Sequence, residues 1–157
     1  PAWGQGLTGQ NRVVSTHAGW RVVVAETNRG RVCYAAGSPR SREPEGAVRG
    51  RAFLFITTRP GGAGRDEISV EFGFDLAGRP VLDLPDGRFE LAVESQTAWI
   101  RDRAEEARLV AAMGKAPQLT IRSVSALGEE TVDTYALEGF VQALAEARQA
   151  CRSGQGS

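Results

Sequence analysis

Apolar and polar residues alternate with a period of two along most of the chain, which is typical of β-strands with one buried face. The alternation is clearest at residues 67–74, where Ile68, Val70 and Phe72 are separated by charged or small residues. Residues 52–57 form a continuous apolar run instead, as expected for a strand buried on both faces. The pattern predicts about eight strands among nine candidate segments: residues 12–16, 20–25, 31–36, 52–57, 67–74, 81–84, 88–94, 118–124 and 130–137.

Two segments change to the period of an amphipathic helix. The first helix is expected at about residues 102–113, with Asp102 at the spacing of a capping box and Leu109, Val110 and Met113 on its buried stripe. The second is expected at about residues 139–151. Its apolar stripe recurs at steps of four, three and four: Phe140, Leu144, Ala147 and Cys151.

Most of the predicted strands are joined by short connections that contain glycine or proline, which favours antiparallel pairing. The fold class expected is therefore mainly β: an antiparallel sandwich or half-open barrel covered by the two helices. A chain of 157 residues suits one domain. We predict a glycine-rich arm at residues 1–10, one domain at residues 11–151 and a polar tail at residues 152–157.

The chain has two cysteines, Cys33 in an early predicted strand and Cys151 at the end of the closing helix. They are far apart and lack CxxC spacing, which argues against a zinc site or a thioredoxin-like motif. In an oxidising compartment the pair should form a disulfide. Closing that loop of 118 residues (151 minus 33) would stabilise the fold by about 4–5 kcal/mol as an upper figure.

The net charge is zero, so the chain as a whole is not drawn toward nucleic acid or anionic lipid. No apolar run reaches the roughly 20 residues that span a bilayer. The charge is unevenly distributed: residues 29–65 carry eight arginines and two acids (+6), and residues 66–157 carry nine bases and sixteen acids (−7). Two solvated faces of opposite sign are the simplest interpretation.

Residues 37–50 form the longest stretch without apolar periodicity and are expected to be a loop. Guanidinium groups match phosphate, sulfate and carboxylate, so the arginines in and beside this stretch are a possible partner-binding loop. These arginines are Arg40, Arg42, Arg49 and Arg51.

Little in the sequence points to catalysis. His17 is the only histidine, which excludes a multi-histidine metal site, and no Gly-x-Ser-x-Gly elbow presents a serine to it. The run Gly61–Gly64 lacks the Lys-Ser/Thr ending of a phosphate loop. We predict no catalytic, cofactor-binding or metal-binding residues. The larger aromatic residues fall at strand positions and are expected in the core: Trp20, Tyr34, Phe53, Phe55, Phe72, Phe74, Phe89 and Trp99.

Several short motifs, in order over residues 19–151, resemble the invasion-associated locus B family of alphaproteobacterial envelope proteins. The Asp133–Phe140 segment, Asp-Thr-Tyr-Ala-Leu-Glu-Gly-Phe, is the most specific of them. The others are Trp20-Arg21-Val22, Val32-Cys33-Tyr34-Ala35, the strand from Phe53 to Thr58-Arg59-Pro60, Glu67-Ile68-Ser69-Val70, Ala98-Trp99, Leu109-Val110-Ala111-Ala112-Met113 and the final Cys151.

The resemblance implies export with removal of a signal peptide, a periplasmic or outer-envelope location, a β-sandwich-like fold and no enzymatic activity. The start at Pro1, without a methionine, is expected of a processed or trimmed N-terminus and equally of a recombinant product. Relatives often carry another cysteine where this chain has Val24, so the family's disulfide connectivity is not carried over.

Three functions are therefore open. The first is a non-catalytic module that binds another envelope or membrane protein, either as an adhesion- or invasion-associated factor or as an accessory subunit on the periplasmic side of a membrane complex. The second is a carrier of a small apolar ligand inside the β layer. The third is a hydrolase that uses His17.

Overall fold

The computed structural model describes residues 11–45, 49–59 and 65–155. Within these ranges the chain forms two antiparallel sheets and two helices, which confirms the predicted fold class. The arm expected at residues 1–10 and the glycine-rich turn at 60–64 lie outside the described residues. The strands are β1 (Asn11–His17), β2 (Trp20–Thr27), β3 (Gly30–Gly37), β4 (Ser41–Glu43), β5 (Phe53–Thr58), β6 (Asp66–Glu71), β7 (Leu76–Leu84), β8 (Gly87–Glu90), β9 (Ala92–Glu94), β10 (Thr97–Trp99), β11 (Gln118–Ser125) and β12 (Glu130–Ala136).

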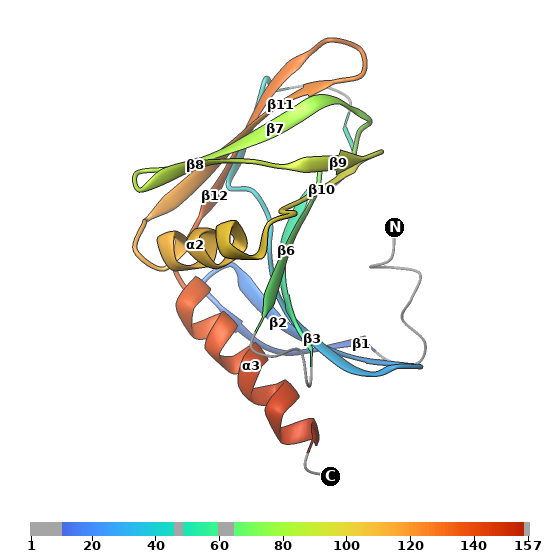
Figure 1. Ribbon diagram of the computed structural model, residues 1–157, viewed down its shortest axis with the longest axis vertical. Helices are drawn as coiled ribbons and strands as arrows, with labels where there is room; N and C mark the ends of the chain where they lie inside the picture. Colours follow the sequence, from blue (N-terminus) through green and yellow to red (C-terminus); the bar gives the residue numbers. More distant parts are fainter. Residues whose placement is uncertain (1–10, 46–48, 60–64, 156–157) are drawn as a thin grey trace.

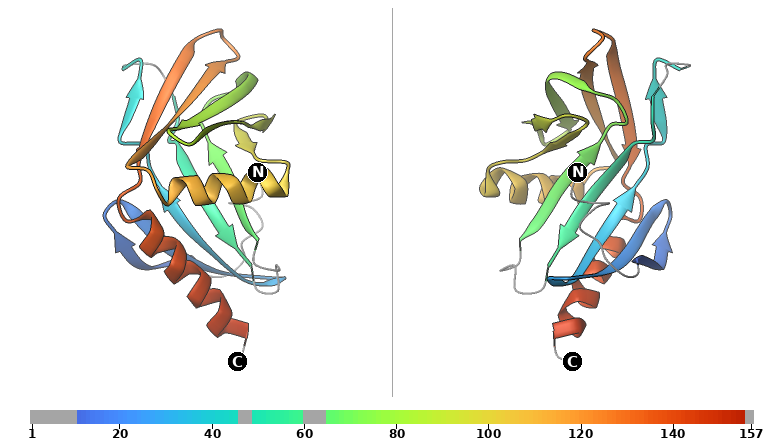
Figure 2. Two further views of the ribbon diagram at one scale, coloured as in Figure 1. Left: turned by 60° about the vertical axis from the view of Figure 1, so that its left-hand side comes forward. Right: turned by 90° about the vertical axis from the view of Figure 1, so that its right-hand side faces the viewer.

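The larger sheet has the order β1-β2-β3-β5-β6-β10-β9, and the smaller sheet has the order β4-β12-β11-β7-β8. The chain passes repeatedly between the two sheets, so neither sheet is complete without segments from both halves of the sequence. Helices α2 (Arg103–Met113) and α3 (Phe140–Gln155) lie on the same side of the larger sheet (Figures 1 and 2). The opposite, outer face of this sheet is not covered by either helix.

Helix α3 covers the inner face of the larger sheet and contacts β1, β2, β3 and β5. All four residues of its predicted stripe are buried: Phe140, Leu144, Ala147 and Cys151. The helix continues to Gln155, four residues beyond the predicted end. Arg152 donates to the side chain of Gln149 at 2.8 Å in this additional turn.

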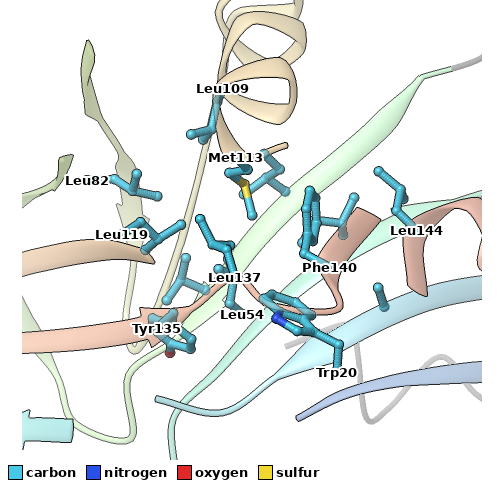
Figure 3. Packing of buried hydrophobic residues seen from close by; sticks show 14 of the residues in the cluster. Trp20, Leu54, Leu82, Leu109, Met113, Leu119, Tyr135, Leu137, Phe140 and Leu144 are labelled. Atoms are coloured by element: carbon cyan, nitrogen blue, oxygen red, sulfur yellow. The ribbon is translucent and has the colours of Figure 1, made fainter. Parts of the chain in front are cut away.

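The core between the layers is built around Trp20 at the start of β2 (Figure 3). Its ring meets Phe140 edge to face, with 5.2 Å between centroids. Its indole Nε1 donates to the carbonyl oxygen of Ala136 in the smaller sheet at 2.9 Å. Gly37 lies under the ring, where a Cβ atom would come within 2.9 Å of it. Trp20 therefore joins both sheets and α3.

Helix α2 begins as its sequence predicts, because the side chain of Asp102 accepts from the backbone N–H groups of Ala104 and Glu105. One turn further, the buried Glu106 accepts from the backbone N–H of Ile68 at 2.9 Å and from Arg65 at 2.8 Å. Strand β10 pairs with β6 only as far as Ser69. The Glu106 carboxylate therefore accepts the hydrogen bond of the next backbone N–H, that of Ile68, which has no partner on β10.

Several elements differ from the sequence prediction. The described residues form twelve strands where about eight were expected: β7 begins at Leu76 rather than at residue 81, and β10 was not predicted. Strand β6 ends at Glu71 rather than at residue 74, because Gly73 adopts φ +80° and its backbone packs directly against Gly50. The stretch 37–50, expected to be a loop, contains β4 at Ser41–Glu43, which pairs with β12. This strand has no apolar periodicity, and the contacts of Arg42 described below hold it in place.

Candidate functional site

The arginines of the predicted partner-binding loop are engaged mainly within the molecule. Arg42 donates from Nε to Asp133 Oδ1 at 3.0 Å, and its other two nitrogens donate to the carbonyl oxygens of Gly50 and Phe72 at 2.7 Å each. Asp133 is almost completely buried, at 1% relative exposure. Removing the guanidinium would leave a buried carboxylate without its closest charged partner, so Arg42 fastens β4 to β12 and to the larger sheet.

The other three arginines of this set make different kinds of contact. Arg49 donates to the carbonyl oxygen of Pro44 at 2.7 Å and lies 4.0 Å from Asp133, so its side chain is nearly buried. Arg40 donates to the side-chain oxygen of Gln118. Arg51 instead lies over the ring of Phe53, 5.7 Å from its centroid, on the outer face of the larger sheet.

Cys33 and Cys151 form the disulfide that the sequence predicts for an oxidising compartment. Their sulfur atoms are 2.17 Å apart and their Cα atoms are 5.9 Å apart. Cys33 lies in the middle of β3 and Cys151 near the end of α3, and both are buried. The bond therefore fixes the far end of α3 to the larger sheet.

His17 lies in a polar cluster with Ser15 and Glu146, which joins β1 to α3. Its Nε2 is 2.9 Å from Glu146 Oε1 and 3.4 Å from Ser15 Oγ, and the Ser15 hydroxyl donates directly to Glu146 Oε2. These hydrogen bonds, from Ser15 and then from His17, hold the pKa of the Glu146 carboxyl below its usual range.

This cluster differs from a serine-histidine-acid relay in one decisive respect. In such a relay the histidine uses one ring nitrogen for the serine and the other for the acid, so that it can accept the serine proton. Here Nε2 faces both partners, and the serine proton is directed to Glu146. The geometry is suited to tying α3 to the edge of the larger sheet rather than to activating Ser15.

A groove of about 300 Å³ lies on the outer face of the larger sheet, over β1, β2, β3 and β5. Its floor is aromatic: Tyr34 and Phe55 meet edge to face with centroids 5.6 Å apart, and Phe55 stacks on Phe53 at 5.7 Å. These three side chains are half-buried. Partial burial raises the pKa of the Tyr34 hydroxyl.

The rim of this groove is basic. Arg12 and Arg21 are exposed, line the groove and form no ion pair with any carboxylate in the described parts of the chain. Arg51 adds a third cation beside the floor through its contact with Phe53. The described residues that line it are Asn11, Arg12, Val13, Gly19, Arg21, Val23, Tyr34, Ala36, Ser38, Phe53 and Phe55, none of which is acidic.

The sequence assigned the aromatic residues to the core without separating the two sides of the larger sheet. Trp20, Phe72 and Phe89 are indeed buried in the core, whereas Phe53 and Phe55 lie on the outer face. The run at residues 52–57 predicted burial on both faces. In β5 its inward residues are fully buried and its outward aromatic residues are only half covered. The apolar residues Phe53 and Phe55 on the outer side of β5 were the feature of the sequence from which the groove could have been predicted.

Neither a metal site nor a membrane-spanning helix is seen in the part of the chain that the structure describes. No group of three or more histidine, cysteine, aspartate or glutamate side chains that could hold a metal occurs among the described residues. No helix within the described ranges is long and apolar enough to cross a membrane. Comparison with protein-family models, with curated proteins and with solved structures gave no match.

Proposed function

We propose that this protein is a non-catalytic protein-binding module of the periplasm or outer envelope. It acts either as an adhesion- or invasion-associated factor or as an accessory subunit on the periplasmic side of a membrane protein complex. The observation that carries the proposal is the outer groove, where half-buried aromatic residues and unpaired arginines lie side by side. Aromatic residues and arginine are the types enriched at the energetic centres of protein interfaces.

Two further observations support this function and location. The disulfide between Cys33 and Cys151 suits an oxidising compartment such as the periplasm. The motifs of the Asp133–Phe140 segment resemble those of a family of exported envelope proteins. The face that we propose as the contact surface is the groove rather than the 37–50 loop, because Arg42 and Arg49 are committed to internal contacts.

Site-specific photo-crosslinking in the native envelope tests the proposal. A photoreactive amino acid is placed at Ser38, an exposed residue of the groove lining, and in a control variant at Leu127, which is 97% exposed on the β11–β12 turn. We expect a single envelope protein to be crosslinked in near-stoichiometric yield from position 38 and not from position 127.

Two results would contradict the proposal. One is recovery of the chain without a crosslinked protein from position 38 under conditions where it is correctly localised. The other is turnover of an ester or amide substrate that is abolished by His17→Ala, which would favour a hydrolase. A small molecule crosslinked in place of a protein would favour the carrier, with its ligand in the outer groove.

A further inference from the structure

The outer groove combines an apolar floor with a rim of cations that lack partners, and these two properties together specify the chemistry of its occupant. We infer that the groove binds an acidic segment of a partner protein, with an aromatic side chain of that segment seated on the floor and its carboxylates on the rim arginines. This inference rests on the proposed protein-binding function and adds the chemical class of the partner.

The size and lining of the floor favour an inserted side chain over a flat contact. A volume of about 300 Å³ is at the small end of ligand sites and admits one or two side chains. Tyr34, Phe53 and Phe55 already meet one another in edge-to-face and stacked geometries. A further ring would extend this arrangement, and aromatic pairs contribute beyond the area that they bury.

The rim distinguishes an acidic partner from a neutral or basic one. Ten of the chain's arginines form ion pairs with aspartate or glutamate side chains, on both sheets and both helices. The other eight arginines form none within the described ranges, and of these eight Arg12 and Arg21 line the apolar groove. A carboxylate on the partner would supply the missing counterion, and a planar guanidinium can hold it with two hydrogen bonds.

The strand register also sets the orientation of the bound segment. Glu71 on β6 lies directly opposite Phe53 on β5, on the side of the floor away from β1. An acidic segment is therefore repelled on the β6 side and attracted on the β1–β2 side. Its acidic residues lie over Arg12 and Arg21, and any basic residue of the segment lies toward Glu71.

Titration with three capped synthetic peptides tests this chemistry on the full chain. The first has a pair of aspartates followed by two phenylalanines, the second has lysines in place of the aspartates, and the third has serines in place of the phenylalanines. We expect the first peptide alone to shift the NMR signals of the groove residues, with binding that weakens as salt is added. The variant Arg21→Glu should weaken it roughly tenfold or more, as expected when an attractive charge becomes a repulsive one.

Arg103→Glu is the matched control, because Arg103 is also exposed and has no ion pair among the described residues, but lies in α2. It should leave the affinity unchanged. The inference is overturned if the lysine or serine peptide binds as well as the first, or if Arg103→Glu weakens binding as much as Arg21→Glu. It is also overturned if anionic phospholipid vesicles bind through Arg21 more tightly than the peptide, or if groove signals shift with protein concentration alone, which would indicate a second copy of the chain.

The two experiments fail independently. If position 38 crosslinks to a protein and no acidic aromatic peptide binds, the protein-binding function stands and only the partner chemistry is wrong. If the peptide binds and no envelope protein is crosslinked, the groove recognises this chemistry without the proposed cellular role.

Discussion

Replacing both cysteines with alanine should lower the free energy of unfolding of this protein by about 4–5 kcal/mol. The Cys33–Cys151 bond closes a loop of 118 residues, which is most of the chain. Without it the unfolded state gains conformational freedom worth about 4–5 kcal/mol in the chain-entropy account of disulfides. Single domains are stable by only about 5–15 kcal/mol, so the loss is a large share of the total.

Urea unfolding followed by tryptophan fluorescence measures this loss. With a slope of about 2 kcal/mol per M, a loss of about 4–5 kcal/mol lowers the unfolding midpoint by roughly 2 M. The slope itself should rise, because the uncrosslinked unfolded state exposes more surface. The wild-type chain with its disulfide reduced provides the control for the loss of sulfur packing, and it should unfold with nearly the same midpoint as the double variant.

Two outcomes would refute this reasoning. A loss below about 1.5 kcal/mol would mean that the unfolded chain is already restricted by residual structure, so that closing the loop removes little freedom. A difference above about 1 kcal/mol between the reduced chain and the alanine variant would mean that packing of the sulfur atoms, rather than the crosslink, accounts for the effect.

Three further predictions address single side chains. Gly139→Ala should lower the free energy of unfolding by at least about 2 kcal/mol more than Gly128→Ala in a urea titration. Both glycines have positive φ (+88° and +89°), but a Cβ at 139 would lie 2.2 Å from a backbone carbonyl oxygen of β1, whereas one at 128 meets nothing within 4 Å. Glu106→Gln should lower the free energy of unfolding by about 1–3 kcal/mol, because an amide cannot accept from both Arg65 and the backbone N–H of Ile68 as the buried carboxylate does. The control Glu105→Gln, on the exposed face of the same helix, should leave the thermal midpoint within error of wild type. Glu146→Gln should reduce stability at neutral pH, because hydrogen bonds hold the pKa of Glu146 low in the folded state; unfolding measured over a pH series should show the difference shrinking from about pH 5 downward, as the carboxylate is protonated.

The parts of the fold that follow from local patterns could be predicted, and those that depend on distant polar pairs could not. The α3 stripe from Phe140 to Cys151 and the N-cap at Asp102 are both present as predicted, because each rests on residues close in sequence. Strand β4 was missed because the ion pair of Arg42 with Asp133 holds it in place, across a separation of 91 residues. No pattern local to either residue reports that contact.

The same distinction applies to the candidate site. The arginine-rich stretch was the clearest polar signal in the sequence, yet Arg42 and Arg49 contact the body of the molecule. The groove depends on which side of the larger sheet Tyr34, Phe53 and Phe55 occupy, and on two arginines from β1 and β2. Sequence alternation separates the two sides of a strand but does not say which side a helix will cover.

The position of α3 has a consequence for when the chain can fold. The strands that α3 covers include the first three, β1 to β3, whereas the helix itself lies at the end of the described chain. As the chain emerges from the ribosome, these strands have an apolar inner face with nothing to bury it until the last helix has been synthesised. The larger sheet therefore cannot bury this face until about 100 further residues, from the end of β3 to the start of α3, have been added. Over that interval the early strands expose an apolar surface of the kind that holding chaperones bind.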